Sequence, residues 1–165
     1  MATLETTQYA AQSAVGSLRS SLSAIDAGAK LRYFEIDITF AGTPAIADTI
    51  NFIRLPSKHK ILPFQSFYKS SASWGAGATM DIGYRTFVKE DGSVQAEVAS
   101  GITSNLDMTV TTRATIVGTA GSLADAMGQV EVTGRGSDIV VYGTIEVDAP
   151  AAGDTLKILL AVLVD

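Results

Sequence analysis

Apolar and polar residues alternate strictly along residues 31–40, LRYFEIDITF. Side chains of a β-strand point alternately to its two faces, so a period of two predicts a strand with one face buried. The buried face would carry Phe34, Ile36, Ile38 and Phe40. The AGTP run at 41–44 is typical of a turn that ends such a strand.

The same signals predict further strands along the chain. They cover residues 47–55, 59–71, 79–87, 106–117, 129–134, 138–148 and 155–164. The last, TLKILLAVLV, is apolar on both faces, which places it centrally between two layers. Proline cannot donate a ladder hydrogen bond, so Pro63 places its strand at a sheet edge or a bulge. Residues 93–104 are predicted as a short helix or a loop, and residues 122–127 as one helical turn.

Eight or nine short strands with glycine-rich turns and almost no helix predict an all-β fold, an antiparallel sandwich or barrel. Long connections such as 88–105 favour Greek-key crossings over a simple meander. Eight strands around a two-sheet core is the number found in jelly rolls. We therefore expect an antiparallel β-sandwich, jelly-roll-like, over residues 29–165, without an internal linker or repeat.

The first 28 residues follow a different pattern. A mostly apolar stripe recurs at alternating steps of four and three, which suits an amphipathic helix. Its members are Leu4, Gln8, Ala11, Val15, Leu18, Leu22 and Ile25. Gly16 and several serines lower the helix propensity of the same segment. Residues 1–28 are therefore predicted as an N-terminal arm or amphipathic helix, and an extended arm would gain order by lying on a neighbouring subunit.

Composition limits the classes of partner. The chain has 17 acidic and 12 basic residues, a net charge of −5, which argues against a general nucleic-acid binder. Charged residues make up 18% of the chain, below the roughly 25% of an ordinary soluble domain. Either partner subunits cover part of the surface, or exposed Thr and Ser side chains replace charged ones.

A membrane partner is not expected. The longest apolar run, residues 156–164, is interrupted by Lys157 and is too short to cross a bilayer. The N-terminus lacks the basic start and apolar region of a signal peptide. We therefore expect synthesis and assembly in a cytoplasm.

Signatures of catalysis do not occur in the sequence. A single histidine, His59, excludes HExxH and multi-histidine zinc sites, and the lack of cysteine excludes thiolate sites. The P-loop, the GxSxG nucleophile elbow and the GxGxxG fingerprint are missing as well. The acidic pairs 35/37 and 146/148 could bind a hard cation, but such pairs more often mark the solvated face of a strand. We expect no enzyme, no cofactor and no metal site.

The segment INFIRLPSKHKILP, residues 50–63, gathers His59 with Arg54, Lys58 and Lys60. We interpret it as a hairpin in which 50–55 and 59–62 are strands, 56–58 is the turn and His59 is exposed. The three basic side chains either contact an acidic surface of a partner subunit or form a solvated turn. Binding of nucleic acid by these three residues is disfavoured, because no aromatic residues are interleaved with a wide basic stripe.

Aromatic residues suggest another kind of surface. The cluster comprises Phe64, Phe67, Tyr68 and Trp74. It could form a glycan-binding platform, but core packing and a subunit interface are favoured, since Trp and Tyr are enriched at interfaces. In a sugar-binding protein, Trp74, Tyr84 and Tyr142 would be the candidate stacking residues.

Three features of residues 1–92 resemble the capsid decoration, or cement, proteins of tailed bacteriophages. One is the Ala- and Ser-rich N-terminal arm. Another is the segment IRLPSKHKILPFQSFYKSS at 53–71, similar to a hairpin with a Leu-Pro turn that those proteins carry. The third is ATMDIGYR at 78–85, followed by DGS at 91–93. The C-terminal half adds only generic strands.

The resemblance implies a jelly-roll sandwich on the outer capsid surface of a virion, often a homotrimer, that braces neighbouring major capsid proteins. It implies no catalytic residues. The residues expected to contact partners are Arg54, Lys58, Lys60, Leu4, Val15, Leu18 and Leu22. Two alternatives remain open: a receptor- or glycan-binding head of a phage fibre, and a head–tail connector or tail structural protein.

Overall fold

The computed structural model describes residues 30–55, 59–89, 92–116, 119–120, 130–132 and 139–164. The arm or helix predicted for residues 1–28, the helical turn predicted at 122–127, and Lys58 lie outside the described residues. Within the described part the strands pair antiparallel, and the one helical element is a single 3₁₀ turn. The prediction of an all-β antiparallel sandwich is therefore confirmed.

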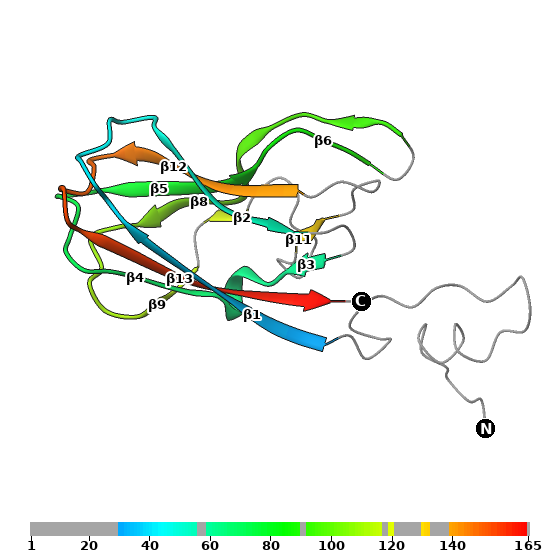
Figure 1. The fold of residues 1–165 in the computed structure, drawn as a ribbon, viewed down its shortest axis with the longest axis horizontal. Coiled ribbons are helices and arrows are strands. Elements are labelled where there is room, and N and C mark those ends of the chain that lie inside the picture. The colour runs from blue at the N-terminus through cyan, green and yellow to red at the C-terminus, as the bar shows by residue number, and fades with distance from the viewer. Residues whose placement is uncertain are drawn as a thin grey trace, which may run out of the picture.

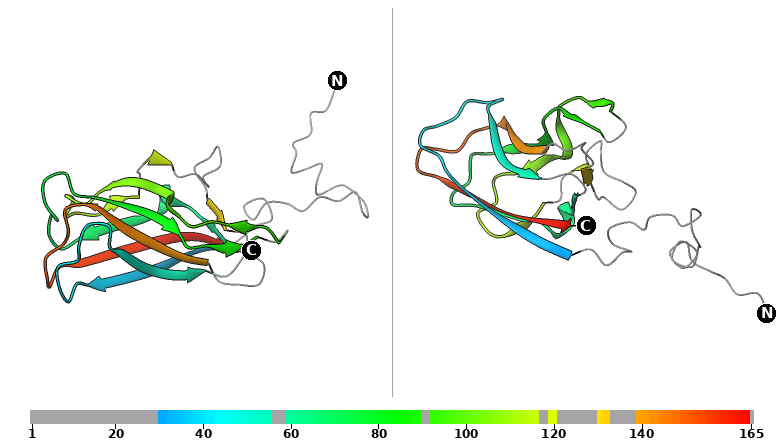
Figure 2. Two further views of the ribbon diagram at one scale, coloured as in Figure 1. Left: turned by 90° about the horizontal axis from the view of Figure 1, so that it is seen from above. Right: turned by 45° about the vertical axis from the view of Figure 1, so that its right-hand side comes forward.

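Two sheets face each other across a shared core (Figures 1 and 2). We call the sheet at the bottom of Figure 1 sheet A. Its strands are β1 (Lys30–Thr39), β13 (Thr155–Val164), β3 (His59–Ile61), β4 (Phe67–Ser70), β9 (Ala114–Thr115) and β11 (Val130–Val132). Sheet B lies above it. Its strands are β2 (Thr49–Leu55), β12 (Ile139–Val147), β5 (Thr79–Tyr84), β8 (Val98–Asp107) and β10 (Thr119–Ala120).

The strand order is that of a jelly roll. In sheet A, β13 lies between β1 on one side and β3 and β4 on the other, and β9 and β11 lie beyond those. In sheet B the order is β2, β12, β5, β8. Consecutive strands such as β1 and β2, or β4 and β5, belong to opposite sheets, as the two Greek keys of a jelly roll require. A small hairpin, β6 (Phe87–Val88) with β7 (Val94–Gln95), extends from the connection between β5 and β8.

The alternation of apolar residues determines which faces meet. β1 and β13 pair over their full ten residues, from Lys30 opposite Val164 to Thr39 opposite Thr155. The inward positions of β1 are Phe34, Ile36 and Ile38, and these pack into the core together with Phe40, which directly follows the strand. β13 contributes Leu156, Ile158, Leu160 and Val162. The central position predicted for residues 155–164 is confirmed, since β13 has strands on both sides.

The strand predicted over residues 59–71 is interrupted in its middle. β3 and β4 both pair with β13, but the 3₁₀ turn η2 (Pro63–Gln65) separates them. The edge position predicted from Pro63 is wrong, because β3 lies between β13 and β11, and β4 lies between β13 and β9. The missing N–H of Pro63 is tolerated because the chain leaves the ladder there and forms a turn instead.

Ser66 closes the gap that this interruption leaves in the ladder. Its buried hydroxyl accepts a hydrogen bond from the Ala161 backbone N–H at 2.9 Å and donates to the Leu62 carbonyl at 2.8 Å. We expect Ser66→Ala to reduce the free energy of unfolding by about 1–3 kcal/mol, because the buried Ala161 N–H loses its acceptor. Urea denaturation of both proteins measures the difference. An unchanged midpoint would contradict this role of the hydroxyl.

Residues 50–63 do not form the predicted hairpin. β2 pairs with β12 in sheet B, whereas β3 pairs with β13 in sheet A, so the chain crosses from one sheet to the other. His59 is not an exposed turn residue either. It belongs to β3, opposite Val164, and is only 9% exposed. A proline-containing sequence between two strands is compatible with both arrangements, and it does not say which sheet each flanking strand joins.

Two further predictions differ from the structure. Residues 93–104, predicted as a helix or a loop, contribute β7 and most of β8. The strand predicted over 106–117 is instead the end of β8, a connection and the two-residue β9. The ladder of β8 on β5 contains two irregularities, which blur the alternation on which the prediction depended.

Candidate partner-binding face

The outer face of sheet A carries rows of side chains that lie side by side across three strands. In one row Glu35 of β1 lies opposite Leu159 of β13, and Leu159 lies opposite Phe67 of β4. In the next row Lys157 is flanked by Asp37 and by Lys69. Cross-strand neighbours on one face lie about 5 Å apart, so these rows form a continuous surface of mixed apolar and charged character.

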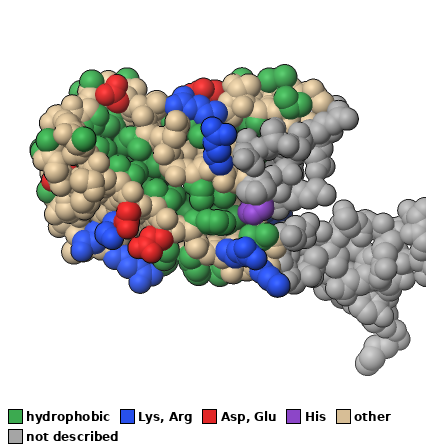
Figure 3. Space-filling model, viewed as in Figure 1, with side chains coloured by type: hydrophobic (Ala, Val, Ile, Leu, Met, Phe, Trp, Pro, Cys, Tyr) green, Lys and Arg blue, Asp and Glu red, His purple; other side chains and the backbone are tan. Residues whose placement is uncertain are grey.

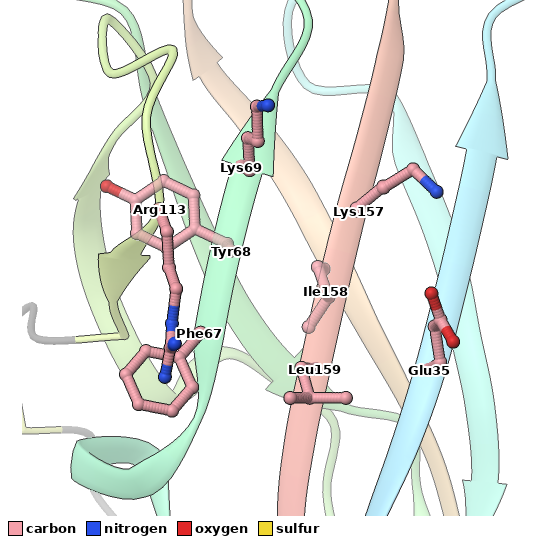
Figure 4. Close-up of a pocket in the computed structure, with 8 residues that line it drawn as sticks. All are labelled: Glu35, Phe67, Tyr68, Lys69, Arg113, Lys157, Ile158 and Leu159. Carbon is pink, nitrogen blue, oxygen red and sulfur yellow. The ribbon is translucent and has the colours of Figure 1, made fainter.

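A groove of about 330 Å³ lies over these rows (Figure 4). It is lined by Glu35, Phe67, Tyr68, Lys69, Arg113, Lys157, Ile158 and Leu159. Arg113 comes from the segment before β9, and its guanidinium carbon lies 3.6 Å from the centre of the Phe67 ring. Figure 4 shows Arg113 lying along Phe67, with Leu159 between that ring and Glu35. The floor is therefore apolar, and charged groups form the rim.

The charges on the rim are unequally compensated. Lys157 forms an ion pair with Asp37 at 3.1 Å, with both side chains more than half exposed, so water screens it strongly. Among the described residues, neither Lys69 nor Arg113 has a carboxylate partner. Lys69 and Arg113 are both exposed. The side of the groove formed by β4 and the segment before β9 is thus basic in a chain whose net charge is −5.

The same face is apolar toward the C-terminal end of β13. Leu62, Ala161 and Leu163 form a small buried cluster separate from the main core. Leu31 and Tyr33 lie directly opposite Leu163 and Ala161 and are 43% and 50% exposed. Figure 3 shows the molecule from the side, with sheet A below and sheet B above, and hydrophobic side chains are visible between charged ones nearer the margins.

The outer face of sheet B holds a polar cluster around Tyr142. The Arg85 guanidinium carbon lies 3.9 Å from the centre of the Tyr142 ring, and Arg85 also pairs with Glu97 and donates to Thr49 at 2.7 Å. Burial raises the pKa of Tyr142 to about 12, and its hydrogen bond to Glu97 acts in the same direction. That hydrogen bond, with Arg85, lowers the pKa of Glu97. Because the charges and donors of the cluster satisfy one another, we interpret it as structural.

High pH should destabilise the fold through two tyrosines. Burial also raises the pKa of Tyr68, whose hydroxyl donates to the Asp107 carbonyl at 2.6 Å, from 10.0 to about 12. Folded-state pKa values above the unfolded ones mean that these stabilising contributions are complete below pH 10 and are lost as the pH rises toward 12. Urea denaturation should therefore show a falling free energy of unfolding over this interval. The matched control is Tyr68→Phe/Tyr142→Phe, which should fall less steeply; parallel curves would contradict the assignment.

The basic residues singled out in the sequence are separated by the fold. Arg54 is exposed on β2 of sheet B, and Lys60 lies on β3 of sheet A. Lys58 and the N-terminal set Leu4, Val15, Leu18 and Leu22 lie outside the described residues. A role for these seven residues in binding partners stays a prediction.

Sequence reasoning missed Lys69 and Arg113. Lys69 could have been found, because it follows Phe67 by two residues in a predicted strand and so shares its outer face. The sequence around Arg113 gave no signal that it lies near Phe67. The strand predicted there is a connection, and only the pairing of the following β9 with β4 places it beside Phe67.

The aromatic side chains named for sugar stacking are buried. Trp74, Tyr84 and Tyr142 are 5%, 1% and 1% exposed, so none of them offers a ring face to a glycan. Trp74 packs edge-on against Phe40, and its indole N–H donates to Ser70 at 2.8 Å. The favoured alternative of core packing is therefore correct for Trp74.

The described residues offer neither a metal-binding cluster nor a membrane-spanning helix. No group of three or more His, Asp and Glu side chains lies close enough together there to hold a metal ion. Asp37, one member of the 35/37 acidic pair, is engaged with Lys157. In the same part of the chain, no helix has the length and apolar character needed to cross a membrane.

Comparison with solved structures finds a chain of similar fold in the capsid asymmetric unit of cyanophage Pam1. The TM-score is 0.52 and the sequence identity 16%, and the match covers 93% of this chain and 99% of the other. No protein-family model matches the sequence, and no curated protein matches it. At 16% identity the likeness shows the fold, which the two chains share over nearly their whole lengths.

Proposed function

We propose that this chain is a structural protein of a bacteriophage virion, and specifically a decoration protein that binds the outer capsid surface. The supporting observation is the likeness in fold to a chain of a phage capsid asymmetric unit, because it extends over nearly the full length of both chains. A jelly roll of the same extent suits the same kind of assembly. The resemblance of residues 1–92 to decoration proteins supports the same role.

The shape of the molecule suits a brace. Two sheets with a continuous core resist bending, and the outer face of sheet A presents apolar and charged side chains together. Binding that favours the assembled state stabilises the capsid by mass action. We propose that the chain acts by this route, by binding rather than catalysis, and that it does so as a homotrimer in contact with major capsid proteins.

Cryo-electron microscopy of virions purified from the phage that encodes this chain tests the proposal. Density for the jelly roll on the outside of the capsid, at positions of threefold symmetry, is the expected result. Native mass spectrometry of the isolated protein should give three times the chain mass. Rings of six or twelve copies at the head–tail junction would point to a connector, and density confined to the tail or its fibres would overturn a capsid role.

A further inference from the structure

We propose that the groove on the outer face of sheet A binds an extended acidic segment of a neighbouring protein in the particle. A carboxylate of that segment pairs with Arg113, an apolar side chain two residues further on lies on Phe67 and Leu159, and Lys69 at the other end of the groove attracts a second carboxylate. This inference rests on the proposed virion role and adds the chemistry of the contact.

Arg113 is already held in position for binding a carboxylate. Its guanidinium is held against the Phe67 ring at 3.6 Å, so the ring fixes the plane of the cation without using its N–H donors. A planar guanidinium with free N–H groups is suited to grip a carboxylate through two parallel hydrogen bonds. Holding the side chain in advance reduces the entropy lost when a partner binds.

The charged side chains that line the groove indicate that the partner segment is acidic. The lining of the groove includes three cations, Lys69, Arg113 and Lys157, and one anion, Glu35. Only Lys157 is paired with a carboxylate within the described residues, so two cations face the groove uncompensated. Complementary charge across an interface favours association and sets the orientation of the partner.

The size and floor of the groove favour a short segment over a flat surface. A volume of about 330 Å³ is at the small end of the roughly 300–1,000 Å³ range of ligand clefts. The floor, whose half-buried apolar side chains are Phe67 and Leu159, can cover one apolar side chain of the partner. An extended peptide whose acidic and apolar residues stand two positions apart presents both on one face, because every second side chain points the same way.

A peptide titration tests this chemistry on the full-length protein. The probe is acetyl-Glu-Ser-Leu-Ser-Glu-amide, and the neutral comparison is acetyl-Gln-Ser-Leu-Ser-Gln-amide, each titrated into the protein while the amide chemical shifts of the protein are followed. We expect at least tenfold tighter binding of the acidic peptide, with shifts concentrated on β4, β13 and the segment before β9. Equal binding of the two peptides, or shifts elsewhere, would overturn the inference.

Two double variants test whether the preference for the acidic peptide depends on the groove. Lys69→Gln/Arg113→Gln should remove the preference for the acidic peptide. The matched control Lys30→Gln/Arg32→Gln changes one lysine and one arginine, both exposed and neither lining the groove, and should keep the preference. Both double variants have the same net charge, so a loss in both would mean a general charge effect and would contradict a specific groove.

Measuring how the wild type and the variants bind to virions tests the groove and the proposed virion role independently. Virions lacking the chain are mixed with the wild type or either double variant and sedimented. Loss of at least tenfold in affinity for Lys69→Gln/Arg113→Gln alone supports the inference. If the wild type binds and this variant binds equally well, the groove is not the contact although the virion role stands. If the wild type does not bind, the proposed function fails. A groove variant that loses its self-association would instead identify a second copy as the occupant.

Discussion

Replacing Gly83 by alanine should reduce the free energy of unfolding by about 3 kcal/mol. A Cβ atom at Gly83 would lie 2.0 Å from the Val98 carbonyl oxygen and 2.3 Å from that of Ala99. Both are backbone atoms of β8, the neighbouring strand, so no side-chain rotation relieves the overlap. The strands would have to move apart, at a place where the ladder between β5 and β8 is already irregular.

The matched control for this prediction is Gly42→Ala. A Cβ atom at Gly42 meets nothing within 4 Å, and the residue is exposed in the turn after β1. We expect a change within about 0.5 kcal/mol there. Urea denaturation followed by circular dichroism measures both variants. Equal stability of the two proteins would show that β8 does not lie where the structure places it.

Replacing Trp74 by alanine should cost about 3–5 kcal/mol of unfolding free energy. The side chain is 5% exposed, packs edge-on against Phe40 with ring centres 5.6 Å apart, and donates its indole N–H to Ser70. Its removal leaves a cavity and takes away a hydrogen bond. Trp74→Phe keeps most of the packing and loses the donor, so we expect a smaller loss of roughly 1–2 kcal/mol.

The control for Trp74 is an exposed apolar residue. Ile46 is 61% exposed, and Ile46→Ala should change the stability by less than about 0.5 kcal/mol. Since Trp74 is the single tryptophan of the chain, its fluorescence also reports the fold directly. Emission typical of a solvated indole in the native protein would contradict its burial and would reopen the idea of a sugar-stacking surface.

These core predictions and the groove variants concern separate properties. Gly83 and Trp74 belong to the fold and should alter stability, whereas Lys69 and Arg113 are exposed and should alter binding. A Lys69→Gln/Arg113→Gln protein with unchanged unfolding and weakened particle binding would therefore assign the groove to function. Loss of particle binding in a destabilised core variant would carry no such meaning.

The sequence by itself determined the all-β class and, where the apolar pattern is regular, which segments are strands and which faces they bury. The period of two in residues 31–40 and the two-sided apolar character of residues 155–164 predicted the inward face of β1 and the central place of β13. Such signals are local, because burial of one face requires apolar residues at every second position whatever strand lies alongside. They sufficed for the all-β class and for the jelly-roll sandwich.

Only the tertiary structure decided which strand pairs with which, and so where side chains distant in sequence meet. Periodicity did not reveal that β2 and β3 belong to opposite sheets, or that His59 is buried. Periodicity also did not predict the contact of Arg113 with Phe67, because that contact depends on the pairing of β9 with β4. Strand pairing is made by backbone hydrogen bonds that every sequence can form, so the choice of neighbour depends on the packing of the whole core.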